Sequence, residues 1–370
     1  MGEWEMVSFS DAIDDVTKLA TKIKKEDYLS HGQYQIIDQG KEYIAGYSDS
    51  PGGLYKDVPA IIFGDHTRII KYIDSPLFIG ADGVKLLKVK NGLDAKFAYY
   101  YLKSCRIIDT GYNRHFKWLK EFQFPLPPLP VQQQIADVLD RASALIEKRK
   151  AQIDKLDLLV KLQFVEMFGD PVTNPKGWSF FKLSEIATSR LGKMLDSKQQ
   201  TGESSYPYLA NFNVKWFSFD FSDLNEMDFN KADQTEFALK KGDLLICEGG
   251  EVGRCAIWKD DIQPCFFQKA LHRVRCDTQK VLPEYLARWF HLRSQYNQFK
   301  DIVGQATIAH LPGVKLRQLE IVVPPVSLQK EFATFVERIE DQKNLLQQSL
   351  AKLEQNYKSL MQKCFRGEIF

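Results

Sequence analysis

Long apolar runs, paired cysteines and an excess of charge of one sign are all missing from this sequence. No stretch is apolar enough for a membrane span, and the first residues lack the basic-then-apolar order of a signal peptide. The six cysteines form no C-x-x-C pair, which is typical of reduced thiols in a cytoplasmic protein, and Cys255, Cys265 and His272 have spacings that fit no zinc module. Because the net charge is only +2, any nucleic-acid surface must come from local clusters of basic residues.

Catalytic signatures are also missing. There is no Walker loop, dinucleotide fingerprint or serine–histidine pair. An adenine-N6 methylase needs a [DN]-P-P-[FYW] motif, and neither Asp170-Pro171-Val172 nor Asn174-Pro175-Lys176 matches it. A nuclease centre could be assembled from Asp82 and Asp94-Ala95-Lys96, but such matches arise by chance in chains of this length. The sequence therefore predicts no catalytic residue and no metal or other cofactor in this chain.

Proline and glycine are both missing between Val131 and Phe168, directly after a segment with prolines at 125, 127, 128 and 130. Proline denies a helix its hydrogen-bond donors, so the helix should start after this segment and continue to Gly169. Its apolar residues recur at heptad spacing, while acidic and basic residues nearly cancel elsewhere. The pattern predicts a long helix that packs on another helix through Ile135, Leu139, Ile146, Ile153, Leu156 and Val160.

The same pattern occurs a second time near the end of the sequence. A single offset in residue number aligns Pro127-Pro128 with Pro324-Pro325 and Gln132 with Gln329, and the alignment needs no gap. The second helix has its own apolar stripe, formed by Phe332, Ile339, Leu346, Leu350, Leu353 and Leu360. Two such helices most simply bury these stripes against each other as an antiparallel coiled coil. The alternative is two independent helices, each packed on its own domain.

Two globular regions alternate with the helices. The expected organisation is a first globular domain at 1–124, a proline-rich entry and helix at 125–170, a second globular domain at 171–323 and a second helix at 324–370. Short apolar runs between Gly, Pro and Asp predict strands, and Ser10 is expected to cap a short helix through Asp11–Ile23. The fold class is therefore α+β, with mixed α/β globular domains and an internal pseudo-twofold repeat.

A polar loop in the first globular region is a candidate for reading DNA bases. Gly64–Arg68 lies between Ile61-Ile62-Phe63 and Ile69-Ile70, and histidine, threonine and arginine side chains can all address base edges. The alternative is a surface turn capped by its aspartate. The candidate DNA-binding residues of this region are His66, Thr67, Arg68, Lys71, Arg114 and His115.

A glycine-rich turn marks the second globular region. The strand expected at Asp243–Cys247 runs into Gly249, Gly250 and Gly253. A phosphate-binding loop would end in G-K-[ST] and lead into a helix, so a tight β-hairpin with Arg254 near its tip is the better interpretation. The candidate DNA-binding residues of this region are Lys193, Arg254, Lys269, His272 and Arg273.

This organisation resembles the specificity (S) subunit of Type I restriction–modification systems, over essentially the whole chain. The segments that carry the resemblance are the two proline-rich entries, the closing F-x-G, the tryptophan-led starts of both globular regions and the glycine-rich turn: Pro125–Gln132, Val323–Gln329, Phe365–Gly367, Trp4, Trp178 and Gly242–Arg254. The first globular region departs from the pattern, because it has no counterpart of the glycine-rich turn beyond Gly64–Arg68.

The resemblance implies a DNA-recognition scaffold without catalysis of its own. Each target-recognition domain would read one half of a split double-stranded target. Two modification subunits would methylate adenine with S-adenosylmethionine, and restriction subunits would translocate and cut DNA with ATP and Mg²⁺. Two alternatives are a specificity subunit that serves a fused restriction–modification polypeptide and a self-contained methylase or nuclease. The sequence does not reveal the bases of either half-site.

Overall fold

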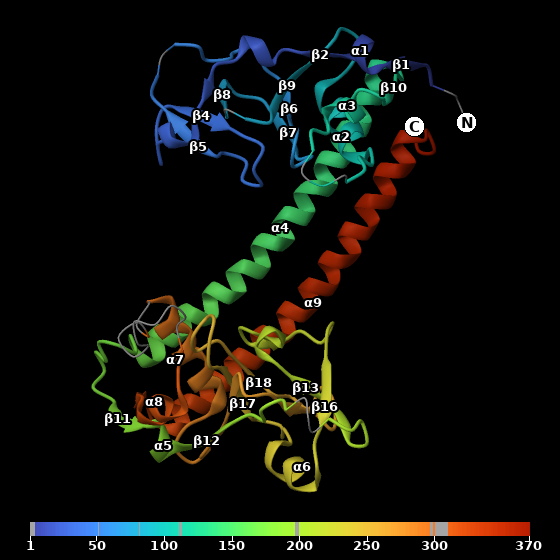
Figure 1. Ribbon diagram of the computed structural model, residues 1–370. Helices are drawn as coiled ribbons and strands as arrows, with labels where there is room; N and C mark the ends of the chain where they lie inside the picture. The colour runs from blue at the N-terminus through green and yellow to red at the C-terminus, as the bar shows by residue number, and fades with distance from the viewer. Residues whose placement is uncertain are drawn as a thin grey trace. The chain divides into compact units, whose positions relative to one another are not determined.

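The computed structural model describes residues 4–50, 52–80, 82–109, 111, 113–196, 200–296, 299 and 310–370. The chain divides into two compact units, one made of Met1–Ala151 with Gln347–Phe370 and the other of Gln152–Leu346. Each unit contains a globular part of strands and short helices and a length of each of two long helices (Figure 1). The predicted α+β class is confirmed.

The globular part of the first unit holds two four-stranded sheets and a short ribbon. The main sheet is antiparallel throughout, in the order β2 (Ile13–Asp15), β9 (Val84–Val89), β6 (Ala60–Gly64), β7 (Ile70–Ile73). The second sheet has the order β3 (Lys22–Ile23), β8 (Leu77–Gly80), β4 (Tyr34–Ile37), β5 (Gly46–Ser48). The ribbon pairs β1 (Met6–Ser8) with β10 (Gln123–Pro125). The helices are α1 (Phe9–Ala12), α2 (Ala95–Ser104) and α3 (Phe116–Leu119), with 3-10 turns at Thr17–Leu19 and Lys25–Asp27.

The second unit repeats this plan. Its main sheet is again antiparallel, in the order β12 (Ala187–Leu191), β20 (Leu271–Cys276), β17 (Leu244–Cys247), β18 (Cys255–Ile257). A three-stranded sheet has the order β16 (Asn225–Asp228), β13 (Ser205–Leu209), β19 (Phe266–Phe267), and two ribbons pair β11 (Ser179–Lys182) with β21 (Glu320–Val323) and β14 (Val214–Lys215) with β15 (Ser218–Phe219). The helices are α5 (Leu183–Ile186), α6 (Lys231–Phe237), α7 (Pro283–Gln295) and α8 (Gly313–Gln318), with a 3-10 turn at Asn211–Asn213.

The start of the first globular part differs from the prediction. Ser8, not Ser10, caps the helix, because the Ser8 hydroxyl accepts a hydrogen bond from the backbone N–H of Asp11. The helix ends at Ala12 instead of Ile23. The chain then becomes strand β2, since pairing Ile13 with Val89 places Ile13 in the core and joins its backbone to the main sheet.

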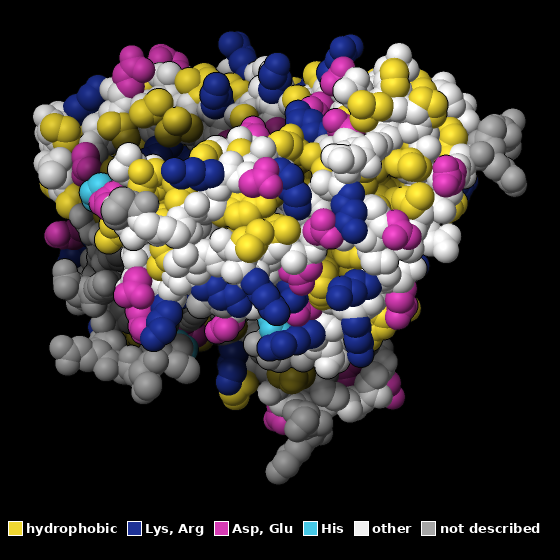
Figure 2. Space-filling view, turned by 90° about the horizontal axis from the view of Figure 1, so that it is seen from above, with side chains coloured by type: hydrophobic (Ala, Val, Ile, Leu, Met, Phe, Trp, Pro, Cys, Tyr) yellow, Lys and Arg dark blue, Asp and Glu magenta, His cyan; other side chains and the backbone are white. Residues whose placement is uncertain are grey.

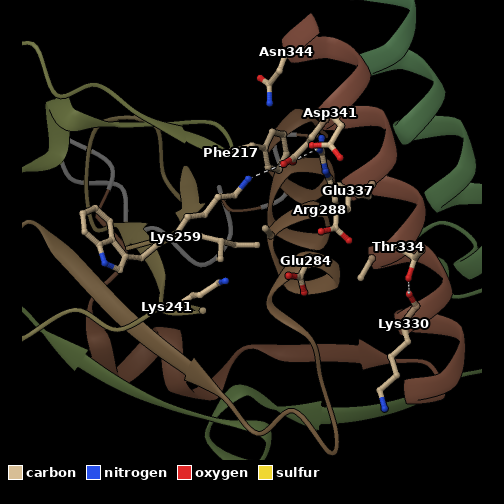
Figure 3. A pocket seen from close by; sticks show the side chains of 17 residues that line it. Phe217, Lys241, Lys259, Glu284, Arg288, Lys330, Thr334, Glu337, Asp341 and Asn344 are labelled. Carbon is tan, nitrogen blue, oxygen red and sulfur yellow. Dashed lines mark hydrogen bonds and ion pairs between the residues drawn. The ribbon is translucent and has the colours of Figure 1, made fainter. Parts of the chain in front are cut away.

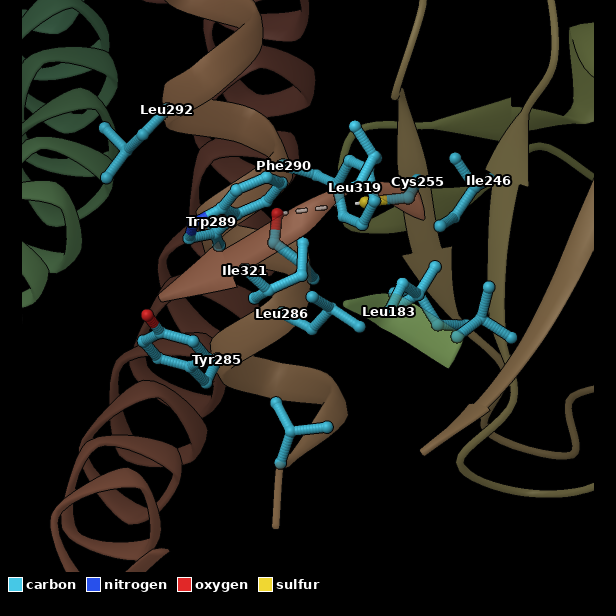
Figure 4. Packing of buried hydrophobic residues seen from close by; sticks show 14 of the residues in the cluster. Leu183, Ile246, Cys255, Tyr285, Leu286, Trp289, Phe290, Leu292, Leu319 and Ile321 are labelled. Carbon is cyan, nitrogen blue, oxygen red and sulfur yellow. Dashed lines mark hydrogen bonds between the residues drawn. The ribbon is translucent and has the colours of Figure 1, made fainter. Parts of the chain in front are cut away.

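One helix in each unit packs across the main sheet and supports it. In the first unit α2 buries Phe97 and Tyr100. In the second unit α7 buries Tyr285 and Trp289, and the Ala287 carbonyl lies 3.8 Å from the Cys255 thiol. Figure 4 shows this packing, in which side chains of α7 meet side chains from the main sheet. The hairpin of β17 and β18 therefore rests on a rigid apolar layer.

Two long helices complete the chain: α4 (Leu129–Phe168) and α9 (Val326–Phe365), each of 40 residues. At about 1.5 Å per residue each spans roughly 60 Å. Helix α4 starts two residues before the predicted Val131, since Pro130 lies in the first turn, where proline is tolerated. It ends where Gly169, with φ of 81°, donates its N–H to the Val165 carbonyl.

Both units contain contacts between α4 and α9. In the first unit Ile135 and Leu139 share a buried cluster with Met361 and Cys364, and Lys150 lies 3.7 Å from Glu354. Of the predicted stripe residues, those that are buried are Ile135, Leu139, Ile146, Ile153, Val160, Phe332 and Ile339. Those that are half-buried are Leu156, Leu346, Leu350, Leu353 and Leu360.

In the second unit the ring centroids of Phe164 and Phe332 lie 5.5 Å apart, and Lys343 donates to Asp157 at 2.6 Å. The helices also pack on the globular parts. Phe365 of α9 lies 5.4 Å from Phe97 of α2, and Phe164 of α4 stacks on Tyr285 of α7 at 5.3 Å. Within each unit, the stretch of each long helix is therefore held both by the other helix and by a domain.

Candidate nucleic-acid interface

The predicted polar loop of the first region is a hairpin turn between β6 and β7, as the sequence indicated. Asp65, only 5% exposed, holds it in place. Its carbonyl oxygen accepts the backbone N–H of His115 at 2.8 Å, and its carboxylate accepts the backbone N–H of Phe116 at 2.8 Å. The turn at 65–69 and the loop before α3 are therefore one structure, although about fifty residues separate them.

The exposed side of this turn presents Thr67 and Arg68. Arg68 has a φ of 61°, which is uncommon for a residue with a side chain, and its backbone N–H donates to Gly64 at 2.7 Å. Its guanidinium donates to Asp109 at 2.6 Å. The Gly111 backbone N–H and the Arg68 guanidinium lower the pKa of the Asp109 carboxyl. Arg68 is thereby directed along the loop that carries Arg114.

Two predicted contact residues of the first region lie inside the protein. Lys71 is 5% exposed, and its ammonium group donates to the Asp38 carbonyl at 2.8 Å. Burial lowers the pKa of Lys71. His115 is fully buried, and its Nδ1 lies 3.0 Å from the Asp65 carbonyl oxygen. By contrast, Arg114 and Thr67 are exposed and His66 is half-buried.

The glycine-rich turn of the second region is the predicted hairpin, formed by β17 and β18. Gly250 and Gly253 have φ of 76° and 83°, in the left-handed region that favours glycine. A Cβ at Gly253 would also lie 2.9 Å from the ring of Phe299. The turn therefore needs glycine for its shape, and no bound phosphate is required to explain these residues.

Asn211 orients the arginine at this turn. The Arg254 guanidinium donates to the Asn211 side-chain oxygen at 2.7 Å and to its carbonyl at 3.1 Å. The Asn211 amide nitrogen in turn donates to the Gly249 carbonyl at 2.9 Å. Glu251 lies 3.5 Å from Arg254 and accepts the indole N–H of Trp216 at 2.6 Å. The tip thus offers a guanidinium and a carboxylate, groups that recognise guanine and cytosine edges in DNA.

The other predicted residues of the second region differ in access. Lys269 is exposed, whereas Lys193 is half-buried and forms a 2.6 Å ion pair with Asp233. Arg273 donates to the Glu236 carbonyl at 2.7 Å. His272 is 1% exposed, its Nε2 lies 3.0 Å from the Leu311 carbonyl oxygen, and burial lowers its pKa. The basic alternation of β20 therefore serves mainly intramolecular contacts.

Both turns occupy the same place in matching sheets. The Glu248 carbonyl accepts the backbone N–H of Leu311 at 2.7 Å, as Asp65 accepts that of His115. The Gly64–Arg68 turn is thus the structural counterpart of the glycine-rich turn. Sequence reasoning missed the residues that hold the turns, which are Gln39, Asp109, Asn211 and Trp216. They carry no spacing signal, because each reaches its turn from a distant segment.

A separate cavity of about 630 Å³ lies beside α7 and α9 in the second unit. Figure 3 shows acidic side chains of α7 and α9 on one wall and Lys241 and Lys259 extending from the other. Lys259 pairs with Glu340 at 2.8 Å, and Arg288 lies 3.5 Å above the Phe217 ring. The lining residues that the structure describes include neither histidine nor cysteine. Glu340 pairs with both Lys259 and Arg288, so part of the charge in this lining serves contacts within the protein.

One face of the molecule is mixed in charge. On the face drawn in Figure 2, dark blue Lys and Arg side chains alternate with magenta Asp and Glu side chains and with apolar ones. Within the described ranges no three His, Cys, Asp or Glu side chains are placed to hold a metal ion, and no helix is both long and apolar enough to cross a membrane.

The comparisons with other proteins agree with this geometry. Residues 1–156 and 175–355 each match the family model described as the Type I restriction modification DNA specificity domain. The chain belongs to this family. The resemblance predicted from the sequence is confirmed, and the two matches correspond to the two repeats found in the structure.

Individual relatives share this family over different lengths. The EcoKI specificity subunit of Escherichia coli K12 is 28% identical over 66% of this chain, and that match spans only 57% of the E. coli subunit. The MjaVIII specificity subunit of Methanocaldococcus jannaschii is 25% identical over 99% of this chain and 93% of its own length. A crystal structure of a Type I S subunit from M. genitalium has the same fold, with a TM-score of 0.59, 18% identity and coverage of 98% and 96% of the two chains.

Proposed function

We propose that this chain is the DNA sequence-recognition subunit of a Type I restriction–modification system. It binds a bipartite double-stranded target, with one half-site for each target-recognition domain, and acts in the cytoplasm, where that DNA lies. The observation that carries the proposal is the repeated turn: each main sheet presents one at the same position, held by the same kind of backbone bond. Two equivalent turns on one chain suit a target with two parts.

The candidate residues divide into contacts and supports by two criteria, their exposure and whether they lie on one of the two turns. Arginine and lysine at or near the surface reach bases and phosphates, while buried polar groups keep the turns in place. We assign DNA contact to His66, Thr67, Arg68, Arg114, Arg254 and Lys269. His115 and His272 then support the turns through the bonds described above, whereas Lys71, Lys193 and Arg273 make protein contacts elsewhere in their domains.

The proposal assigns four segments to the chain. Target-recognition domains at 1–124 and 171–323 alternate with spacer helices at 125–170 and 324–370. The helices pair as an antiparallel coiled coil, and the repeats are related by a pseudo-twofold axis. Contacts within each unit support this pairing, because Lys150 meets Glu354 in one and Asp157 meets Lys343 in the other. The residue number rises from 150 to 157 in α4 while that of the partner falls from 354 to 343 in α9, which is the order expected of antiparallel helices.

Partner subunits supply the catalysis in this proposal. Leu145, Leu158, Leu159 and Leu162 of α4 are between 42% and 56% exposed, which is unusual for leucines beside a helix pair. They offer apolar surface to helices of modification subunits, and the two recognition domains of the chain suggest two such subunits. Native mass spectrometry at saturating modification subunit should give two copies per chain, and a complex that holds one would contradict this stoichiometry.

S-adenosylmethionine, ATP and Mg²⁺ belong to those partner subunits. The sequence supports a chain without methylase activity of its own, because neither Asp170-Pro171-Val172 nor Asn174-Pro175-Lys176 matches the methylase motif. A specificity subunit for a fused restriction–modification polypeptide is the second candidate. Both candidates recognise DNA in the same way. The neighbouring gene distinguishes them, because it would encode a fused restriction–modification polypeptide in the second case.

The deciding experiment compares this chain alone with the chain plus its partners. Purified chain with labelled S-adenosylmethionine and mixed genomic DNA should transfer no methyl group. Co-expression with the modification subunit should methylate adenine within one split motif, read by methylation-sensitive sequencing. Methyl transfer by the chain alone would make it a methylase, and a contiguous motif would contradict the two-domain target.

A further inference from the structure

A fully buried glutamine lies in the first turn of each long helix. Gln132 of α4 and Gln329 of α9 are both 0% exposed. Glutamine is mostly found at protein surfaces, and burial of its amide is costly unless hydrogen bonds satisfy it. The two positions correspond in the sequence repeat, so the arrangement occurs once in each unit.

Gln132 joins three segments of the first unit. Its side-chain oxygen accepts the backbone N–H of Asp94 at 2.7 Å. Its amide nitrogen donates to the carbonyl of Gly92 at 2.9 Å and to that of Pro127 at 2.8 Å. Asp94 caps α2 by accepting the N–H of Phe97, and Pro127 belongs to the entry of α4. One side chain therefore fastens the start of α2 to the start of α4.

Gln329 repeats these bonds in the second unit. Its oxygen accepts the backbone N–H of Leu282, which precedes α7, at 2.8 Å. Its nitrogen donates to the carbonyls of Lys280 at 3.0 Å and Pro324 at 2.8 Å. The globular parts have diverged in sequence, yet the bonds that fasten each of them to its long helix are the same. We call each of these sets of bonds a joint. Both joints therefore use the same residue and the same set of bonds.

We propose that Gln132 and Gln329 are positioning residues that determine the half-site separation at which this chain binds DNA. This inference rests on the proposed function. Helices α2 and α7 support the sheets that carry the two turns, so a rotation at either joint moves a turn with its whole domain. A base pair advances the duplex by only about 3.4 Å, so a small rotation at the joint changes which gap fits.

The test uses the full chain assembled with its modification subunits. Its substrate is a DNA library in which the number of base pairs between the two half-sites, here called the gap, is varied. Gln132→Met and Gln329→Met keep side-chain length but leave one N–H and two carbonyls without their partner. Wild type should methylate one gap length. We measure the ratio of methylation at that gap to methylation at gaps one base pair longer or shorter. In each variant this ratio should fall about tenfold, because the lost hydrogen bonds no longer hold the domain in one position on the helix. The half-site sequences should stay unchanged.

A purely structural role gives a different result, because loss of folded protein lowers methylation at all gaps by one factor. Gln133→Met, the same change at an exposed neighbour, is the matched control and should keep wild-type selectivity. Should a methionine variant not fold, Gln132→Asn and Gln329→Asn carry the test, because the shorter amide keeps a donor and an acceptor but cannot reach all three partners. Folded variants with undiminished gap selectivity, or an equal loss at all gaps, would overturn the inference. A wild-type complex that methylates no bipartite sequence would instead overturn the proposed function.

Discussion

The indole N–H of Trp216 donates to the carboxylate of Glu251 at 2.6 Å, and the Trp216 ring lies 4.6 Å from the imidazole of His291. Glu251 belongs to the glycine-rich turn, whereas His291 belongs to α7. Trp216 therefore connects the turn to the helix on which the second core is built. A hydrogen bond to a charged acceptor is among the stronger ones in proteins.

Trp216→Phe should loosen the glycine-rich turn. The change keeps an aromatic ring against His291 but removes the indole donor. Because Glu251 is half exposed, we expect a loss of about 1 kcal/mol in the free energy of unfolding, measured by urea titration of the full chain. Glu251→Gln, which keeps an acceptor, should cost less. Equal stability of Trp216→Phe and wild type would show that this bond contributes nothing.

Arg68 and Arg254 should each affect one half of the DNA target. We expect Arg68→Ala to relax or weaken recognition of one half-site and Arg254→Ala that of the other, by about 1–3 kcal/mol each. The measurement is the methylated motif of the complex, read by sequencing. If both variants leave motif and affinity as in wild type, the turns do not read bases.

Lys269→Ala provides the contrast for Arg254→Ala. Lys269 is exposed and near the second turn, so we assign it to the phosphate backbone. Its removal should weaken binding to all sequences alike and reduce the slope of log affinity against log salt by about 0.9. Arg141→Ala, which removes one exposed charge from α4, serves as the control for net charge and should leave the motif unchanged.

His291 should make the stability of the second unit fall in acid. Burial, and then the charges of Arg288 and Lys161, lower the pKa of His291 to about 4, against about 6.5 in the unfolded chain. Between these values the unfolded state binds a proton that the folded state does not. The stabilising contribution is therefore present above pH 6.5, is lost as the pH falls toward 4, and changes no further below that.

His291→Phe keeps a ring beside Trp216 and cannot titrate. Between pH 7.5 and pH 5, wild type should lose about 1 kcal/mol more unfolding free energy than the variant, once the shift is discounted for partial exposure. Urea titrations at both pH values provide the measurement. Identical losses in the two proteins would mean that His291 titrates normally in the folded state.

The long helices should act as a ruler between the recognition domains. One heptad added after Ile153 and another after Gln348 preserves the ion pairs of Lys150 with Glu354 and Asp157 with Lys343. At about 1.5 Å per residue the insertion adds roughly 10 Å, or about three base pairs, and these also turn the groove by roughly a hundred degrees. We expect reduced methylation, unchanged half-site sequences and a preference for a longer gap. Full activity at the original gap would show that the helices do not measure distance.

Local and periodic signals in the sequence were enough to predict several elements of the fold. The heptad after the proline segment predicted α4, because a continuous apolar stripe without proline or glycine stabilises only a helix. Its second copy predicted α9. Glycines between two apolar runs predicted the hairpin of β17 and β18, and the same reasoning placed the turn at Gly64–Arg68. The family resemblance rested on these features and on their repetition.

Which polar residues face inward, and what holds each turn, depends on contacts between distant segments of the folded chain. From the sequence, Lys71, His115 and His272 were predicted to contact DNA at the surface. In the structure all three are buried, and each bonds a backbone carbonyl from a distant segment. Asn211, Asp109 and the glutamines of the joints act across long stretches of sequence, so no local pattern reveals them. A hydrogen bond between distant segments depends on the packing of the whole unit, and that packing is a property of the folded chain and not of any one segment.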